Sequence, residues 1–454
     1  MCGARVVAVL ATLAVGLVGA SAVLASSALA TARVHSVGGS SAKGELSWHG
    51  GPVLHSSRPY LIFWTPSGES IPAGSQSLLE RYLTDVAADS GKSSNVFGVL
   101  RQYYDRAGFA DYRQTFDPAR QVIVDTQPYP PQDPAQCPDV SVTYPTCISD
   151  GQIHSELQRL ITTDGLPSAG PASAAELPAN APIYFVVLPA DVDVCQTFGT
   201  LCTDDKICGY HESFVDSRGD NVLYAPFPLA PLRVGSLLIP DPKGVCQWDN
   251  TSVVQDPNGD INADLLIGGL SHEDSETITD PIYGLGWFNT STNQEAGDEC
   301  QFSGPFNPAK DHNPNAFLPT LGGSEAAGTL YTQLINNHPY YIQSMWSNGD
   351  GNCEMRPTAG KIVPRFAVPR GPSTTGKTLS FNSGASTSRN ALSSATWTFG
   401  DGSKPAFFSG HAAITRVKHR YRRAGRYAIT LTLVDNRGNL QSTTRRVTVH
   451  PRRT

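Results

Sequence analysis

The chain has 454 residues with 40 Asp and Glu, 34 Lys and Arg, and a formal net charge of −6. The small net charge hides two oppositely charged segments, because residues 365–454 carry sixteen Lys and Arg against two acids, which is +14 and leaves −20 for residues 1–364. The sequence has no phosphate-binding glycine loop, no Gly-x-Ser-x-Gly elbow and no nucleic-acid motif, so we expect no nucleic-acid partner and no serine hydrolase of the elbow type.

The amino terminus has the pattern of a secretory signal peptide. A basic start, Met1–Arg5, precedes a short apolar run and two small-x-small sites, Ala28-Leu29-Ala30 and Ala30-Thr31-Ala32. We predict a signal peptide over 1–32 and a low-complexity Ser/Gly/Ala segment over 33–47. No second apolar run of membrane-spanning length follows, so we expect a secreted, extracellular protein without a membrane span, free or held on the cell surface by non-covalent contacts.

Cysteine usage agrees with export. Eight of the nine cysteines remain after Cys2 is removed with the signal peptide. An even number in an oxidising compartment favours disulfides, and four bridges allow roughly 105 connectivities that sequence cannot resolve. The disulfide candidates are Cys137, Cys147, Cys195, Cys202, Cys208, Cys246, Cys300 and Cys353.

The segment 48–355 alternates between strand and helix patterns. The apolar run Tyr60–Trp64 predicts a buried strand, and apolar residues at helical spacing predict helices over about Gln76–Ala88 and Asn95–Tyr104. Pro182–Leu188 and its flanking prolines predict a second buried strand. We therefore expect an α/β or α+β domain with disulfide-pinned loops. Residues 356–364, poor in apolar side chains, read as a linker.

A third predicted helix carries the chemistry. The alternating acidic and amide residues from Asp256 suggest calcium, but an EF-hand loop requires Gly and Glu where Ile261 and Ile267 stand. Capping of a helix that begins near Asp260 or Asn262 is the alternative. Apolar spacing predicts one buried helix that ends before Asp280-Pro281.

His272 and Glu276 are four residues apart, so they project from one face of this helix, and Glu273 lies beside them. A mononuclear zinc hydrolase needs two ligands one helical turn apart and a carboxylate next to the first ligand that accepts a proton from water. Glu295 and Asp298 follow about twenty residues later, where a second element could fold back and Cys300 could pin it. The simpler alternative is a solvated acidic helix.

His211, in Cys208-Gly-Tyr-His-Glu212, is a candidate further ligand or a second-shell residue, or else a packing residue beside a disulfide.

The last segment, 365–450, predicts five short strands separated by Gly and Asn turns, which is typical of a small immunoglobulin-like β-sandwich. Its motifs resemble the polycystic kidney disease (PKD) domain; they are Trp397-x-Phe399-Gly400-Asp401-Gly402, His419-x-Tyr421, Gly425-x-Tyr427 and Leu431-x-Leu433-Val434-Asp435. This resemblance implies a spacer or polymer-binding module. Its excess of basic residues favours an anionic envelope polymer as partner; surface charge without a specific purpose is the alternative.

The segment from Trp48 to Cys353 resembles the phosphate-induced, EXORDIUM-like family in the order of several short motifs. These are His49–Leu54, Tyr60–Trp64, Cys208–His211, Pro257–Asp260, Thr279–Pro281, Trp287, Glu295-x-x-Asp298-x-Cys300, Tyr341-x-Gln343-x-x-Trp346-Ser347-Asn348 and Cys353. Bacterial members are similar to metallopeptidases with the helix motif His-Glu-x-x-Glu-x-x-Thr-Asp-Pro. The resemblance implies that His272, Glu273, Glu276, Glu295 and Asp298 form one site. Many plant members of the family keep the fold without the His-Glu pair, so the resemblance does not imply that the fold requires catalysis.

Two functional hypotheses follow. The first is a secreted zinc-dependent, peptidase-like hydrolase of extracellular protein or polysaccharide, with Glu273 as general base. Its ligands are His272, Glu276 and either Asp298 or Glu295. The second is a non-catalytic matrix or cell-envelope adhesion protein in which the same cluster is structural or binds calcium.

Overall fold

The computed structural model describes residues 45–137, 145–196, 201–203, 207–229, 233–234, 237–238, 255–300, 320–414 and 416–452. The signal peptide predicted for 1–32, residues 33–44 of the low-complexity segment and Cys246 lie outside the described residues. Within these ranges, no helix combines the length and the apolarity needed to cross a membrane.

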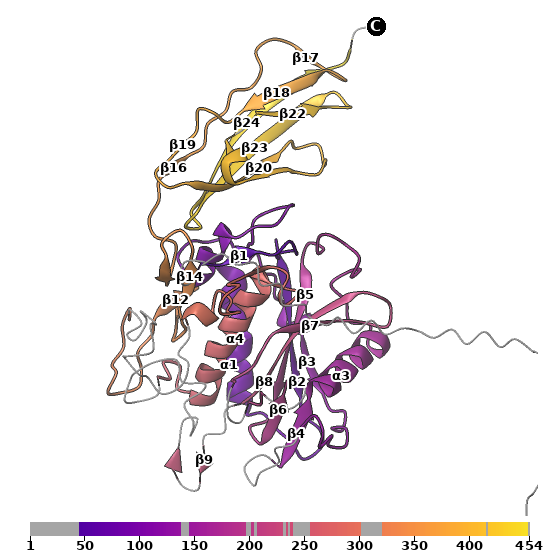
Figure 1. Ribbon diagram of the computed structural model, residues 1–454, viewed down its shortest axis with the longest axis vertical. Helices are drawn as coiled ribbons and strands as arrows, with labels where there is room; N and C mark the ends of the chain where they lie inside the picture. Colours follow the sequence, from indigo (N-terminus) through magenta and orange to yellow (C-terminus); the bar gives the residue numbers. More distant parts are fainter. Residues whose placement is uncertain are drawn as a thin grey trace, which may run out of the picture. The chain divides into compact units, whose positions relative to one another are not determined.

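A five-stranded sheet in the order β3-β2-β5-β8-β7 lies at the centre of residues 45–355 (Figure 1). Its strands are β2 (Ser57–Trp64), β3 (Val122–Asp125), β5 (Ala181–Leu188), β7 (Glu212–Val215) and β8 (Asn221–Pro228). The first four strands in this order are parallel, and β7 pairs antiparallel with β8 at one edge. This part of the chain is therefore a mixed helix and strand fold.

Both faces of this sheet are buried. Leu61 and Phe63 of β2 point into one hydrophobic core, whereas Tyr60 and Ile62 point into a second core on the other side. Helices α1 (Ala73–Ala88) and α4 (Ile261–Thr279) cover the first face, and α3 (Asp150–Thr163) covers the second (Figure 1). A parallel sheet covered on both faces explains why its strands read as continuous apolar runs rather than as alternating patterns.

Shorter elements complete this part of the chain. They are β1 (Ser47–Trp48), η1 (Val96–Gln102), α2 (Pro118–Gln121), β4 (Thr146–Ser149), β6 (Val192–Cys195), β9 (Arg233–Val234), β10 (Leu237–Leu238), β11 (Trp287–Phe288), η3 (Asp298–Cys300), β12 (Gln333–Ile335), β13 (His338–Tyr340), β14 (Met345–Ser347) and β15 (Asn352–Glu354). The helix expected over Asn95–Tyr104 is instead the short 3-10 helix η1. Valine residues and Gly98 in this stretch disfavour an α-helix.

Helix α4 is buried along almost its whole length, from Ala263 to Thr279. Asp260 caps its first turn, because Oδ1 accepts a hydrogen bond from the Ala263 N–H at 3.2 Å. The helix ends before Asp280, as predicted from Pro281. Because α4 is buried, it is not the solvated acidic helix of the alternative interpretation. Its charged groups lie in the protein interior, where each requires a partner.

The C-terminal part is a β-sandwich with its own core. Its strands are β16 (Ile362–Val363), β17 (Ser373–Thr374), β18 (Thr378–Asn382), β19 (Thr387–Ser388), β20 (Leu392–Thr398), β21 (Ala406–Ser409), β22 (Arg416–Arg420), β23 (Gly425–Asp435) and β24 (Leu440–His450), with the 3-10 helix η4 (Gly410–Ala413). One sheet has the order β17-β24-β23-β20-β21, and β18 pairs with β22. The core contains the expected aromatic residues Trp397 and Tyr421.

Two details differ from the sequence expectation. One of the five short strands, predicted from the sequence over Phe366–Val368, is reduced to a single bridge at Ala367. Pro364 and Pro369 on either side lack the N–H that a ladder needs. Strand β16 begins inside the segment 356–364, which the sequence suggested as a linker, and Ile362 packs into the sandwich core.

Candidate metal centre

The three candidate residues of α4 lie on one buried side of the helix. His272 Nε2 lies 3.1 Å from Glu276 Oε2 and 3.9 Å from Glu273 Oε1. Only 4% of the His272 and Glu276 side chains and 10% of the Glu273 side chain is exposed. The helical repeat alone produces this pair, because residues four apart in a helix are neighbours on its surface.

The segment that contains Glu295 and Asp298 folds back onto this face. Glu276 Oε1 accepts hydrogen bonds from the backbone N–H groups of Gly297 at 3.0 Å and Asp298 at 2.9 Å. Asp298 Oδ1 lies 3.4 Å from His272 Nε2. The structure therefore brings together both carboxylates that the sequence placed beyond the helix and the residues of α4.

Gly297 allows this close approach. A Cβ atom at this position would stand 2.8 Å from His272 Nδ1 and 2.9 Å from Glu276 Oε1, closer than side chains tolerate. The Cys300–Cys353 disulfide anchors the end of the same segment to β15. The returning backbone is thus held in van der Waals contact with the helix.

Gln343 orients His272 from the far side of the ring. Its Oε1 lies 3.2 Å from His272 Nδ1, and its Nε2 donates to the Gly297 carbonyl at 2.9 Å. Since an amide oxygen only accepts, this contact assigns the proton to Nδ1 in the neutral ring and leaves Nε2 as the ligand atom. Sequence patterns alone predict no role for Gln343, although it lies in the Tyr341-x-Gln343-x-x-Trp346 motif.

His211 and Glu295 face each other across the same space. His211 Nε2 lies 3.4 Å from Glu295 Oε2, and 3% of each side chain is exposed. Neither ring nitrogen of His211 makes a hydrogen bond, because the contact with Glu295 has an ion-pair distance but no hydrogen-bond geometry. Glu295 Oε1 also lacks a partner. The His211 backbone N–H donates to the Glu273 carboxylate.

These side chains line a cavity of about 140 Å³. All six candidate residues contribute to its wall: His211, His272, Glu273, Glu276, Glu295 and Asp298. Tyr283, which the sequence reading missed, also lines the cavity, and Asn293 donates a hydrogen bond to its hydroxyl at 3.0 Å. No sequence motif marked Tyr283, because it lies in a turn after the helix.

Burial and mutual repulsion shift the pKa values of the carboxylates. Burial raises the pKa of Glu273 to about 8, although His272 opposes the shift. Burial and the neighbouring Glu276 raise the pKa of Glu295 well above its usual range. These shifts indicate that several carboxylates are crowded around one small cavity. A bound cation would remove this repulsion.

The two histidines respond in opposite directions. Burial disfavours the charged form of His272, but the carboxylates of Glu276 and Glu273 outweigh it and hold that pKa well above its usual range. Burial, reinforced by the charge of His272, lowers the pKa of His211 to about 3. His211 is therefore a neutral imidazole at neutral pH, which is the form that binds metal ions.

The donor set fits zinc. Imidazole nitrogen and carboxylate oxygen are zinc ligands, and bonds of about 2.0–2.1 Å place neighbouring ligand atoms of a tetrahedral site roughly 3.3 Å apart. The separations of 3.1 and 3.4 Å from His272 Nε2 to Glu276 and Asp298 match this spacing. The buried ring nitrogens of His211 and Oε1 of Glu295 make no hydrogen bond, so they are free to serve as donors to a metal ion.

The segment considered for calcium has other contacts. Asp260 caps α4 and its Oδ2 accepts from the Ser75 hydroxyl at 2.8 Å. Asp264 accepts from the Asn258 backbone N–H at 3.0 Å and from its side-chain amide at 2.7 Å. These carboxylates serve the local structure, in agreement with the capping interpretation.

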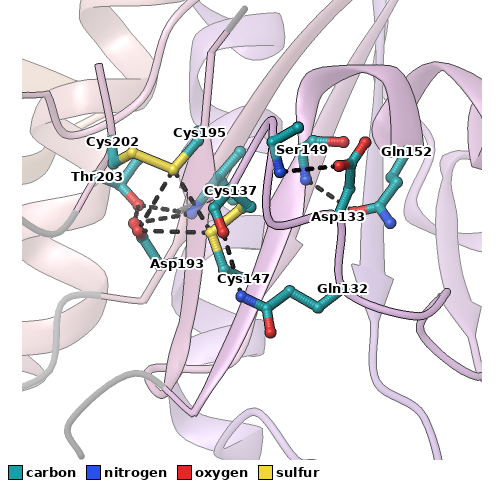
Figure 2. The surroundings of a disulfide bond; sticks show 12 residues. Gln132, Asp133, Cys137, Cys147, Ser149, Gln152, Asp193, Cys195, Cys202 and Thr203 are labelled. Atoms are coloured by element: carbon teal, nitrogen blue, oxygen red, sulfur yellow. Dashed lines mark hydrogen bonds between the residues drawn. A yellow bond between two sulfur atoms is a disulfide. The ribbon is translucent and has the colours of Figure 1, made fainter. Parts of the chain in front are cut away.

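Disulfides pin the loops of this part of the chain. The pairs are Cys137–Cys147, Cys195–Cys202 and Cys300–Cys353, and Cys208 is also disulfide-bonded. Figure 2 shows the first two side by side on β4 and β6, where the Sγ atoms of Cys147 and Cys195 are 3.5 Å apart. Cys208 lines the cavity. One bridge therefore lies directly at the candidate site.

The comparisons with known proteins concern mainly the C-terminal part. Residues 363–450 match the family model of the PKD domain. These residues are a PKD domain. The PKD1 domain of Vibrio anguillarum Epp is 27% identical, with 20% of this chain and 95% of that chain covered and a TM-score of 0.17. The PKD1 domain of the Vibrio cholerae metalloprotease PrtV is 22% identical, with 20% and 96% covered and a TM-score of 0.16.

A second likeness covers most of the chain at low identity. OgpA from Akkermansia muciniphila covers 87% of this chain and 95% of its own at 9% identity, with a TM-score of 0.24. No curated protein matches the sequence. None of the comparisons supports the resemblance to the EXORDIUM-like family. The PKD domain, the disulfides and the lack of a membrane-spanning helix among the described residues are together consistent with an extracellular location.

Proposed function

We propose that residues 48–355 form a secreted zinc-dependent hydrolase of the peptidase type and that the PKD domain holds it at an extracellular polymer. The observation that carries this proposal is the convergence of two histidines and four carboxylates on one cavity of about 140 Å³. Burying so many ionisable groups is costly without a counter-ion, so the arrangement favours a metal site over an acidic surface.

His272 and Glu276 would hold the zinc ion, with Asp298 or Glu295 as a further ligand. Gln343 and the Gly297 carbonyl fix the His272 ring, and two backbone N–H groups fix the Glu276 carboxylate. When bound, the ion would act as a Lewis acid that polarises the carbonyl of the scissile bond.

Glu273 would serve as the general base. It lines the cavity next to His272, and the His211 backbone N–H orients its carboxylate. A nearby cation favours the ionised carboxylate over the protonated form that burial favours. Glu273 could then accept a proton from the attacking water and return it to the leaving amine.

Metal analysis tests this proposal. We expect about one or more zinc ions per chain in the mature protein by mass spectrometry, with a marked decrease in His272→Ala and in Glu276→Gln. Glu273→Gln should retain the metal but lose hydrolysis in a peptide-library screen. A correctly folded wild-type protein that binds no zinc would contradict the proposal.

The alternative, an adhesion protein without catalysis, draws support from the PKD domain. Such domains mediate binding to protein or carbohydrate, and this one presents Arg416, Lys418 and Arg420 on the exposed side of β22. Three outward cations at two-residue spacing form a basic row that suits an anionic envelope polymer.

Sedimentation of the full chain with an anionic cell-wall polysaccharide tests this tether. Replacing all three residues of the row with Ser should weaken binding and its salt dependence. The matched control replaces the exposed Arg365, Arg370 and Arg389, which removes the same charge elsewhere on the sandwich. Equal weakening in both variants would show that only net charge matters.

A further inference from the structure

The two histidines of the cavity belong to different groups of ligand atoms. Side-chain donors of His272, Glu273 and Glu276 lie within 4.8 Å of one another, and so do those of His211, Glu276 and Glu295. Glu276 is the member that both groups share. One four-coordinate ion needs all of its ligand atoms roughly 3.3 Å from one another. The donors therefore form two clusters that meet at one carboxylate.

The second cluster contains buried polar atoms that make no hydrogen bond within the protein. Both ring nitrogens of His211 and Oε1 of Glu295 make no hydrogen bond, although 3% of each side chain is exposed. A buried polar group without a hydrogen bond lowers the stability of a fold. His211 and Glu295 both line the cavity, so a ligand bound there would satisfy them.

Charge balance also favours more than one cation. The cavity wall contains four carboxylates, those of Glu273, Glu276, Glu295 and Asp298. With all four ionised, one divalent ion bound by neutral imidazoles would leave two negative charges at a cavity where Glu273, Glu276 and Glu295 are buried. Two divalent ions would balance all four, which low-dielectric surroundings strongly favour.

The cavity has room for this content. Its volume of about 140 Å³ compares with about 30 Å³ for one water molecule in the liquid. Two ions and the solvent that completes their coordination fit into such a volume.

We propose that the cavity binds two divalent transition-metal ions, one at His272 and a second at His211 and Glu295, with Glu276 as the carboxylate between them. This inference rests on the proposed function and adds a second ion to the same site. A pair of ions would stabilise both the attacking and the leaving groups of a hydrolytic reaction.

The test is metal stoichiometry of the mature full-length protein. The protein is stripped with a chelator, loaded with Zn²⁺ or Co²⁺, desalted and measured by mass spectrometry against protein concentration. We expect two ions per chain in the wild type. His211→Ala and Glu295→Gln should each bind one ion, and His272→Ala should keep the ion at the second cluster.

A spectroscopic readout distinguishes neighbouring ions from two unrelated sites. Two Co²⁺ ions that share Glu276 are magnetically coupled, so the electron paramagnetic resonance signal per cobalt should be weaker in the wild type than in Glu295→Gln. His338→Ala is the matched histidine control, because this half-exposed ring pairs with Asp85 at 2.7 Å outside the cavity and should leave two ions bound.

Each outcome decides a separate question. One ion in the wild type, retained in His211→Ala and Glu295→Gln, overturns the two-ion proposal and leaves the proposed hydrolase intact. No ion in a folded wild type overturns both. Circular dichroism of each variant identifies a folding defect, and the nearly isosteric Glu295→Gln decides the question if His211→Ala does not fold.

Discussion

Gly297→Ala is the most informative single substitution, because it adds one methyl group next to both His272 and Glu276, the two principal ligands that we propose. The new Cβ would lie 2.8 Å from His272 Nδ1 and 2.9 Å from Glu276 Oε1, whereas ordinary contact begins at 3.4 Å. Each neighbour must therefore move by roughly 0.5 Å, and such overpacking costs about 1–3 kcal/mol of folding stability.

The displacement exceeds what a metal site accepts. Ligand distances in such sites vary by about 0.2 Å, and disturbing the groups that orient a ligand lowers metal affinity by about 10–100-fold. We expect a loss of this size in a zinc competition titration with a fluorescent chelator, and a lower midpoint in urea unfolding.

Gly269→Ala provides the matched control. It lies in α4 itself, and its added Cβ would stand 3.5 Å from Phe227, which is ordinary contact. Gly269→Ala should bind zinc as tightly as the wild type. Because Ala has a higher helix propensity than Gly, the free energy of unfolding should rise by up to about 1 kcal/mol. Equal zinc affinity in Gly297→Ala and Gly269→Ala would refute the argument that Gly297 sets the ligand geometry.

Three further predictions concern stability and ligand orientation. Burial raises the pKa of Asp264 to about 7, so the folded state holds this proton more tightly than the unfolded chain does. The contribution of Asp264 to the free energy of unfolding should therefore be highest below a pH of about 4 and should fall as the pH rises through 7. The total loss is at most about 4 kcal/mol. In urea unfolding, the free energy of unfolding of Asp264→Asn relative to that of the wild type should therefore be higher at pH 8 than at pH 5. The same relative value at both pH values would contradict this prediction. Removal of the Cys300–Cys353 bridge, which spans 53 residues, should lower the free energy of unfolding by about 4 kcal/mol, because the unfolded chain gains loop entropy. Removal of the Cys195–Cys202 bridge, which spans 7 residues, should lower it by only about 2 kcal/mol. A larger loss of thermal stability for the second bridge would contradict this. Gln343→Leu should lower zinc affinity by about 10-fold or more with little change in fold, since only the orienting hydrogen bond to the imidazole is lost.

Local patterns in the sequence predict the elements well where one residue type controls the conformation. Asp260 and Pro281 mark the two ends of α4, and Gly400 and Gly402 adopt the left-handed backbone of the expected turn, with φ of +73° and +78°. The PKD domain is recognisable because its motifs are dense and ordered within fewer than a hundred residues.

Long-range contacts are what the sequence does not reveal. The sequence predicts that α4 is buried, but it does not indicate which elements cover the helix. Nor does it indicate that Gln343 reaches His272 from 71 positions away. Disulfide pairing has the same character, because each bridge depends on the tertiary fold. The helix expected at Asn95 fails for a local reason, since the valines and Gly98 of η1 have weak helix propensity.

The two adjacent disulfides in Figure 2 have a consequence for making the protein. Cys147 and Cys195 lie on paired strands with their sulfur atoms 3.5 Å apart, so a thiolate released from one bridge is within reach of the other. Thiol–disulfide exchange between the two bridges then requires little backbone movement. Preparations from a reducing cytosol should thus contain isomers paired through Cys147 and Cys195, and a uniform product requires an oxidising host with an isomerase.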